Sequence, residues 1–215
     1  MYAYKIGISA DEHDQFVKNS PQTNLLQSSS WAKVKDDWGN ERIGFYKDEK
    51  LVATASILIR PLPLGMTMFY IPRGPVMDYL NQELVTFVLT SLKKLANQKR
   101  ALFIKFDPFI LFQHHQIDQE AVQNPDAETI VRNLQTAGCE WVGRTTDMAE
   151  NIQPRFQANI YAKDFSEANL SKKIRQSIRT AKNKGVQVRF GAHELLADFA
   201  DLMKKTEDRK SIHLR

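Results

Sequence analysis

The first residues that could do chemistry lie in "SSSWAKVKDDWG", where two tryptophans stand seven residues apart. Seven residues are two helical turns, so the spacing predicts a helix with Trp31, Val34 and Trp38 on its buried face. On that helix Lys35 lies within about 40° of Trp31, whereas Lys33 points away into solvent. Lys35 either lays its methylenes along the apolar surface with its ammonium in water, or holds the ammonium beside an aromatic wall for a phosphate or carboxylate. Spacing alone leaves both interpretations open.

Two further stretches carry polar groups at predicted strand ends. In "IPRGPVMD" two prolines fix the backbone around Arg73 and Gly74, which makes either a plain turn or, with Trp38, part of a pocket wall. In "IKFDP" alternation places Lys105 and Asp107 on one side of a strand end. Asp107 precedes a proline, as turn-starting residues do, and no second carboxylate is evident for acid–base work, so we expect a structural role for it.

Positive charge gathers between Leu170 and Ala192, where seven cations occur without an acid, in a chain of 215 residues with a net charge of +5. Four of these cations recur at helical spacing in "LSKKIRQSIRTAKNK" and form one stripe: Lys172, Arg175, Arg179 and Lys182. A charged stripe is usually a solvated face, but solvated faces normally mix signs. Contact with the phosphates of a polyanion is therefore the better interpretation.

Several common kinds of site are missing from the sequence. The single cysteine, Cys139, excludes an intrachain disulfide and a cysteine-based metal site. The histidines lack metal-ligand spacing, and there is no GxGxxG, P-loop or GxSxG motif. We therefore expect no metal and no cofactor, and no catalytic residue can be assigned. The N-terminus lacks the features of a signal peptide and no apolar run is long enough to span a membrane, which favours a cytoplasmic location.

The elements that must position these residues alternate irregularly between strands and helices, which predicts an α+β fold with a mixed sheet flanked by helices. "LVATASILI" is apolar at nearly every position and is predicted to be a central strand. "ALFIKFDP" is predicted as another buried strand and "VQVRF" as a strand late in the chain. Ser9 and Glu12 form a capping box before a helix. A later helix carries one apolar stripe: Leu84, Val88, Leu92 and Leu95.

We expect a first domain at residues 1–144 and an incomplete second domain at residues 145–215. Six stretches then occur in a characteristic order: "WAKVKDDW" with "GFYKDEKLVATASILI", "YIPRGPVMD", "IKFDP", "NIQPRFQANI", "SKKIRQSIRTAKNKGVQVRFG" and "TEDRKSIHLR". In this order the chain resembles the Fem family of peptidoglycan-bridge aminoacyltransferases, in the FemX and MurM style. It departs from the family pattern at Arg73, where the family loop has a lysine.

The resemblance implies domains related to N-acetyltransferases (GNAT-like) and the transfer of alanine, serine or glycine from aminoacyl-tRNA. The acceptor would be the stem-peptide lysine amine of a muramyl-pentapeptide precursor, either lipid II or UDP-MurNAc-pentapeptide. Because the substrate supplies its own amine as nucleophile, catalysis would rest on positioning and on stabilisation of the developing oxyanion. Lys35 matches the family lysine that binds the precursor diphosphate, and Arg215 matches the arginine that joins it.

Three expectations follow from this resemblance. The protein would meet the inner face of the membrane through lipid II. The cationic stripe would contact tRNA phosphates, an inference from charge and not from the matched motifs. Family members continue beyond this length, so we expect the 215-residue chain to lack most of its second domain and to be inactive alone.

Two other function classes compete with this one. An RNA-binding module built on the basic helix predicts a steep salt dependence of RNA binding and no response to muramyl peptide. An acyl-CoA N-acetyltransferase ranks last, because a Gly-rich pyrophosphate loop before a helix is not evident.

Overall fold

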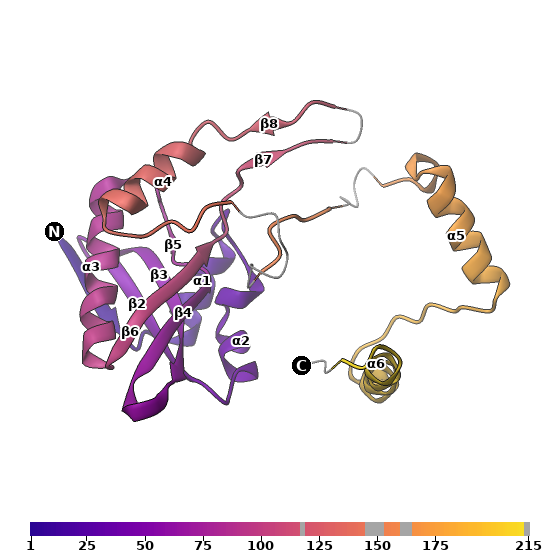
Figure 1. Ribbon diagram of the computed structural model, residues 1–215, viewed down its shortest axis with the longest axis horizontal. Helices are drawn as coiled ribbons and strands as arrows, with labels where there is room; N and C mark the ends of the chain where they lie inside the picture. The colour runs from indigo at the N-terminus through magenta and orange to yellow at the C-terminus, as the bar shows by residue number, and fades with distance from the viewer. Residues whose placement is uncertain (117–118, 145–152, 160–164, 213–215) are drawn as a thin grey trace. The chain divides into compact units, whose positions relative to one another are not determined.

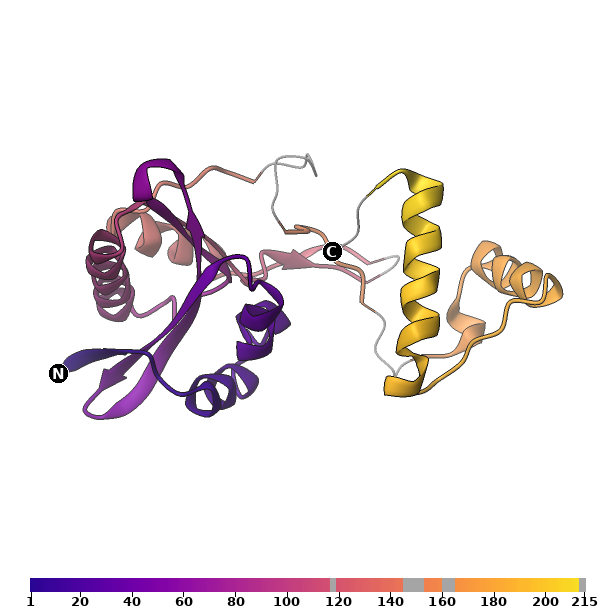
Figure 2. The ribbon, with the colours of Figure 1, turned by 90° about the horizontal axis from the view of Figure 1, so that it is seen from below.

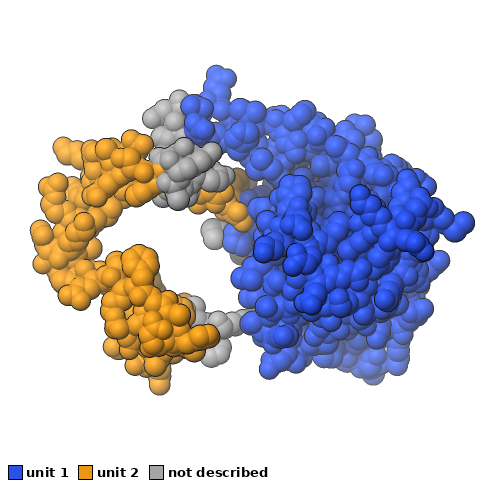
Figure 3. Space-filling model, turned by 180° about the vertical axis from the view of Figure 1, so that it is seen from behind, with its two compact units in different colours: residues 1–155 blue, residues 156–215 orange. Residues whose placement is uncertain are grey.

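The computed structural model describes residues 1–116, 119–144, 153–159 and 165–212. The chain divides into two compact units, Met1–Arg155 and Phe156–Arg215 (Figure 3). The division expected from the sequence, between residues 144 and 145, stays a prediction. Each unit is described below by itself.

The first unit is built on a mixed sheet whose strands run in the order β1-β2-β3-β4-β6, with β5 paired to β3 (Figure 1). All neighbours are antiparallel except β4 and β6, which run parallel. The strands are β1 (Tyr2–Ile6), β2 (Gly39–Lys47), β3 (Lys50–Pro61), β4 (Thr67–Arg73), β5 (Val76–Met77) and β6 (Ala101–Pro108). A separate two-stranded sheet pairs β7 (Gln113–His114) with β8 (Val122–Gln123).

Helices cover both faces of this sheet. Figure 2 shows α3 and α4 on one face and α1 and α2 on the other. The helical segments of the first unit are α1 (Ala10–Lys18), η1 (Leu25–Gln27), α2 (Ser29–Val34), η2 (Pro63–Gly65), α3 (Gln82–Gln98) and α4 (Ala127–Thr136). A mixed sheet flanked by helices confirms the predicted α+β class.

The main core lies between the sheet and α3. The predicted stripe of α3 is buried at all four positions: Leu84, Val88, Leu92 and Leu95. From β3, alternate residues Ala53, Ala55 and Ile57 enter this core, while Thr54, Ser56 and Leu58 are buried on the opposite face. β3 is therefore covered on both faces, which confirms the central strand predicted from its nearly continuous apolar sequence.

Local signals also fixed the helix starts. The Ser9 side chain accepts a hydrogen bond from the Glu12 backbone N–H at 3.1 Å, which is one of the two bonds of the predicted capping box, while the Glu12 carboxylate accepts a bond from the Tyr46 hydroxyl at 2.7 Å. The Asn81 side chain accepts a bond from the Leu84 N–H at 3.1 Å and begins α3. These caps set the first residues of α1 and α3.

The prediction for β6 was wrong in one respect. β6 forms, but it is the last strand of the described sheet and pairs only with β4, so Leu102 is 58% exposed and Phe103 51% exposed. A run of apolar residues looks the same in an edge strand as in a central one, because the sequence does not show how many neighbours a strand has.

The second unit has four described helical segments: η5 (Glu167–Asn169), α5 (Lys172–Asn183), η6 (His193–Leu195) and α6 (Leu196–Lys210). The predicted strand "VQVRF" is not formed; Val188 is 77% exposed and Phe190 95% exposed. No residue is buried among those that the structure describes in this unit. No described helix of either unit is both long enough and apolar enough to cross a membrane.

Candidate functional site

The parallel pairing of β4 and β6 brings polar groups together at the carboxyl ends of both strands. The register sets Pro72 opposite Asp107 and Arg73 opposite Pro108. Asp107 Oδ1 accepts a hydrogen bond from the Arg73 backbone N–H at 3.0 Å and one from the Tyr70 hydroxyl at 3.3 Å. Asp107, expected from the sequence to be a simple turn residue, therefore stands at the centre of a hydrogen-bonded cluster.

Burial controls the electrostatics of this cluster. Removal from water raises the pKa of Asp107, against the opposing effects of the Arg73 N–H, the Arg73 charge and the Tyr70 hydroxyl. Burial, and then the Asp107 charge, raises the pKa of Tyr70, which is only 6% exposed. The Tyr70 hydroxyl also accepts a bond from the Gln153 side-chain amide at 3.3 Å. Asp107 is thus a carboxylate that binds a proton more readily than an exposed aspartate.

Arg73 is fixed by several contacts at once. Its backbone has a positive φ of 55°, and its guanidinium donates to the Pro154 carbonyl at 2.6 Å. The guanidinium carbon lies 5.7 Å from the Phe109 ring centroid. The Gly74 N–H faces the Ile71 carbonyl at 3.4 Å. Of the three residues predicted for a pocket wall, Arg73 and Gly74 therefore lie beside Asp107. The Arg73 N–H is directed at the Asp107 carboxylate, and the Arg73 guanidinium and the Gly74 N–H are directed at backbone carbonyls.

The helix that carries Lys35 is shorter than predicted. α2 ends at Val34, and Lys35 leaves helical geometry with φ −98° and ψ 51°. The predicted buried face is consequently wrong: Ala32 is 2% exposed, whereas Val34 is 63% exposed. Trp38, predicted to be buried on this helix, is only half-buried and lies beyond the helix end, in a turn where its N–H donates to the Lys35 carbonyl at 3.1 Å.

Lys35 nevertheless differs from Lys33 as expected. Lys33 is exposed, while Lys35 is half-buried with its Nζ 6.0 Å from the Trp31 ring centroid. A second cation, Arg60, lies with its guanidinium carbon 5.6 Å from the centroid of the Trp38 ring. Among the described residues, neither Lys35 nor Arg60 forms an ion pair with a carboxylate. The Lys35 ammonium and the Arg60 guanidinium therefore lie beside aromatic rings and can each bind an anion.

One apolar cluster connects this cationic surface with Asp107. Ala32, Leu58 and Tyr70 are buried together, and Trp38 and Met68 pack against them. Tyr70 contributes its ring to this cluster and its hydroxyl to Asp107. The candidate site therefore consists of the Lys35–Trp38 turn and Arg60 on one side of Tyr70, and of Arg73 and Asp107 on the other.

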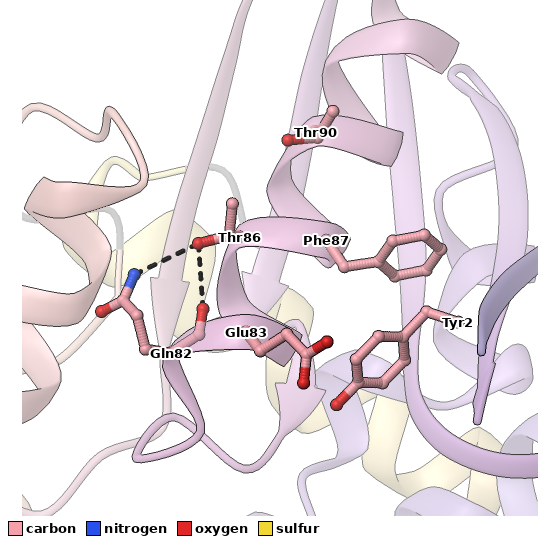
Figure 4. A pocket seen from close by; sticks show the side chains of 6 residues that line it. All are labelled: Tyr2, Gln82, Glu83, Thr86, Phe87 and Thr90. Carbon is pink, nitrogen blue, oxygen red and sulfur yellow. Dashed lines mark hydrogen bonds between the residues drawn. The ribbon is translucent and has the colours of Figure 1, made fainter.

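A separate depression lies at the other face of the sheet, over the first half of α3 (Figure 4). Its lining residues are Tyr2, Gln82, Glu83, Thr86, Phe87 and Thr90. Tyr2 and Phe87 stack with centroids 5.2 Å apart, and Gln82 and Thr86 bond to each other. The lining contains one charged group, Glu83, and no base–nucleophile pair, so it does not compete with the Asp107 cluster as a catalytic site.

Comparison with known proteins decides the family. The sequence profile of the FemAB family matches residues 8–215. The chain belongs to the FemAB family. Curated relatives include lipid II:glycine glycyltransferases of Staphylococcus aureus strains MRSA252 and bovine RF122 / ET3-1, each 33% identical over 213 residues. These matches cover 95% of this chain and 48% of each relative, so the chain spans about half the length of the curated relatives it matches.

A solved structure supports the same assignment. The crystal structure of FemX superposes with a TM-score of 0.74 at 30% identity, covering 99% of this chain and 52% of that one. The FemAB membership confirms the resemblance found in the sequence, and the superposition confirms the fold over nearly the full length of this chain.

The remaining residues predicted for a FemAB site lie elsewhere or outside the described part. Arg215 falls in residues 213–215, which the structure does not describe, so its pairing with Lys35 stays a prediction. The cationic stripe lies on α5 of the second unit, where all four side chains are exposed: Lys172, Arg175, Arg179 and Lys182. Among the described residues no group of three or more His, Cys, Asp or Glu side chains is arranged to hold a metal ion.

Sequence reasoning missed three residues of this site. Tyr70 had a usable signal, because a tyrosine inside a buried strand needs a partner for its hydroxyl. Arg60 and Gln153 had none, because their partners lie far away in sequence: Trp38 for Arg60 and Tyr70 for Gln153.

Proposed function

We propose that this chain belongs to an enzyme that transfers an amino acid from aminoacyl-tRNA to the stem-peptide lysine of a muramyl-pentapeptide precursor. The FemAB match and the relatives named lipid II:glycine glycyltransferase support this reaction class. The acceptor is lipid II or UDP-MurNAc-pentapeptide, and the amino acid is alanine, serine or glycine. The protein acts in the cytoplasm and meets the inner face of the membrane when its acceptor is lipid II.

Asp107 is the proton acceptor in this proposal. The lysine amine of the acceptor must lose a proton before its nitrogen can attack the ester carbonyl of the aminoacyl-tRNA. A carboxylate whose pKa burial raises is a better base than an exposed aspartate. The new C–N bond replaces the C–O ester bond, and the proton taken by Asp107 passes to the ribose oxygen that leaves. The second proton, which the nitrogen loses as the amide forms, is released to water.

The observation that carries the proposal is the environment of Lys35. Its Nζ stands 6.0 Å from the Trp31 ring centroid and pairs with no described carboxylate, although Asp36 and Asp37 follow it directly in sequence. In our proposal Lys35 binds the precursor diphosphate together with Arg215.

A matched pair of variants tests this assignment. A charge-assisted hydrogen bond to a phosphate contributes enough that Lys35→Met should weaken binding of UDP-MurNAc-pentapeptide by about 10-fold to 100-fold. Lys33→Met removes the same charge two residues earlier, from the exposed side of α2, and should leave the affinity within about twofold. Isothermal titration calorimetry measures both, and equal effects of the two variants would contradict the proposal.

The assignment of Asp107 has its own test. Binding of the precursor brings the lysine ammonium near the carboxylate, so the precursor should lower the pKa of Asp107 measured by carbon-13 NMR. The same precursor with an acetylated lysine amine should leave that pKa unchanged. A pKa that responds equally to both ligands would show that the amine does not reach Asp107.

The donor is proposed to bind at α5 of the second unit. Its four exposed cations lie within a segment that contains no acid, which favours contact with tRNA phosphates. Replacing Lys172, Arg175, Arg179 and Lys182 by glutamine should weaken tRNA binding and flatten its salt dependence. The alternative function, an RNA-binding module, predicts the same loss for any RNA, and predicts no binding of the muramyl precursor by the unchanged protein.

A further inference from the structure

The sheet splits between β3 and the β4–β5 segment, and a single side chain fills the split. β3 pairs Leu58 with Tyr70 on β4, but it pairs Thr54 with Val76 on β5. If the β3–β4 pairing continued, Ser56 would lie opposite Pro72 and Thr54 opposite Gly74. Thr54 instead pairs with Val76, so the β3–β5 pairing is displaced by two residues. The chain between β4 and β5 therefore bulges away from β3 at this point.

Gln27 occupies this position. It is the last residue of η1 and has no exposed surface. Its side-chain amide donates to the Pro72 carbonyl at 2.6 Å and to the Ser56 carbonyl at 3.3 Å, and its side-chain carbonyl accepts the Ser56 N–H at 3.0 Å. One carboxamide thus takes the place of a strand peptide between two residues that the ladder would otherwise pair. Proline has no N–H, so Pro72 could not donate to Ser56 itself.

The backbone next to this carboxamide has no room for a side chain at Gly74 while Gln27 keeps its position. A Cβ on Gly74 would come within 2.6 Å of Gln27 Cδ and 2.7 Å of its Oε1. Gln27 is in turn held through its own backbone, because its carbonyl accepts a hydrogen bond from His13 Nε2. The side chain is therefore fixed at both ends between α1 and the Arg73–Gly74 bulge.

The bulge is the segment that carries the Asp107 hydrogen bond. Arg73 follows Pro72 directly, and its N–H donates to Asp107 Oδ1 at 3.0 Å. Because the Pro72 carbonyl and the Arg73 N–H belong to the same peptide unit, the bond from Gln27 fixes the plane of that unit and the direction of its N–H.

We propose that Gln27 is a positioning residue that sets the Arg73 N–H on Asp107 and so controls the orientation and proton affinity of that carboxylate. The inference rests on the proposed function for its catalytic meaning, because Asp107 is the proposed proton acceptor. The geometry from Gln27 to Asp107 is independent of any substrate.

The test measures the titration of Asp107 by carbon-13 NMR in the full chain. Gln27→Met keeps a similar volume but removes all three hydrogen bonds. Without them the Arg73 N–H turns away from the carboxylate, and the pKa of Asp107 should shift upward from its wild-type value. Asn133→Leu is the matched control: Asn133 is a buried carboxamide that donates to the Tyr79 and Leu80 carbonyls at 2.9 and 3.2 Å. It should lower stability and leave the titration of Asp107 unchanged.

Gly74→Ala gives a second, independent variant if Gln27→Met does not fold. The added Cβ must displace the Gln27 carboxamide, so the pKa of Asp107 should again rise. In a Gln27→Ala background the conflict disappears, and Gly74→Ala should then change the melting temperature much less than it does alone. An unchanged Asp107 titration in folded Gln27→Met or Gly74→Ala would overturn the inference, as would an equal shift in Asn133→Leu.

The same measurements separate this inference from the proposed function. If the titration depends on Gln27 but the protein binds no muramyl precursor, the function is wrong and the positioning role stands. If the precursor binds through Lys35 while Asp107 titrates independently of Gln27, the positioning role is wrong and the function stands.

Discussion

His13 should make the stability of the first unit depend on pH in a direction that its burial sets. The ring has no exposed surface, and Nε2 faces the Gln27 carbonyl, which can only accept, so Nε2 carries a hydrogen. Nδ1 lies 2.7 Å from the Thr54 hydroxyl, whose single hydrogen also faces the Ile43 carbonyl at 2.9 Å. Protonation of the ring would place a charge in a buried site.

Burial is the main cause that lowers the pKa of His13 below its ordinary value of 6.5. The nearby Arg42 charge acts in the same direction, while the Gln27 carbonyl and Asp14 oppose it. A lowered folded-state pKa gives stability that is present above the unfolded value and is lost as the pH falls toward the folded value. Between the folded and unfolded pKa values, uptake of one proton by the unfolded chain lowers the free energy of unfolding by about 1.4 kcal/mol per pH unit. The free energy of unfolding can therefore fall by at most about 2 kcal/mol between pH 6.5 and about pH 5.

Urea unfolding at a series of pH values between about 8 and 5 measures this loss. All three tryptophans lie in Met1–Arg155, so their fluorescence reports on the first unit. His13→Gln cannot titrate, and subtracting its profile from that of the wild type cancels every other group. His114→Gln, on the exposed β7, is the matched control and should follow the wild type. Parallel profiles for the wild type and His13→Gln would refute the reasoning.

Three further outcomes are expected. Phe45→Ala, at a site with no exposed surface, should lower the free energy of unfolding by about 3–5 kcal/mol, whereas Phe103→Ala on the edge strand should cost about 1 kcal/mol or less; urea midpoints compare them. Tyr46 should ionise near pH 12 in an ultraviolet titration, because burial and its bond to Glu12 raise its pKa to about 12, and stability from it is lost as the pH rises through that value. Burial raises the pKa of the Cys139 thiol, so iodoacetamide should modify it more slowly in the folded chain than in urea.

The sequence predicted the parts of the fold that depend on local periodicity. The α3 stripe and the Ser9 cap depend on residues three or four positions apart, and both formed as expected. The predicted buried face of α2 was wrong for a related reason. The helix spans only Ser29–Val34, which is too short for periodicity to define one buried face. Extrapolating 100° per residue across the helix end to Trp38 predicted a buried face shared by Trp31, Val34 and Trp38, whereas the buried apolar residue of α2 is Ala32.

The candidate site was predictable only in part. Lys35 was recognised because its charge conflicts with the tryptophans around it within one short segment. Asp107 was discounted because its partners Tyr70 and Arg73 precede it by more than thirty residues, as the separations of 37 and 34 positions show. Those partners meet it only because β4 and β6 pair in parallel, a choice of neighbour that no single strand's sequence specifies.

The arrangement of charge at the site matches an acceptor with opposite charges at its two ends. Lys35 and Arg60 present cations beside aromatic rings, without a carboxylate partner among the described residues. Across Tyr70, Asp107 presents a half-buried carboxylate. A precursor with a diphosphate at one end and a lysine ammonium at the other would place each charge opposite its complement. A nucleic acid alone offers only phosphates, which Asp107 would repel, so the charges of this first-unit site support the muramyl precursor of the proposed function over RNA.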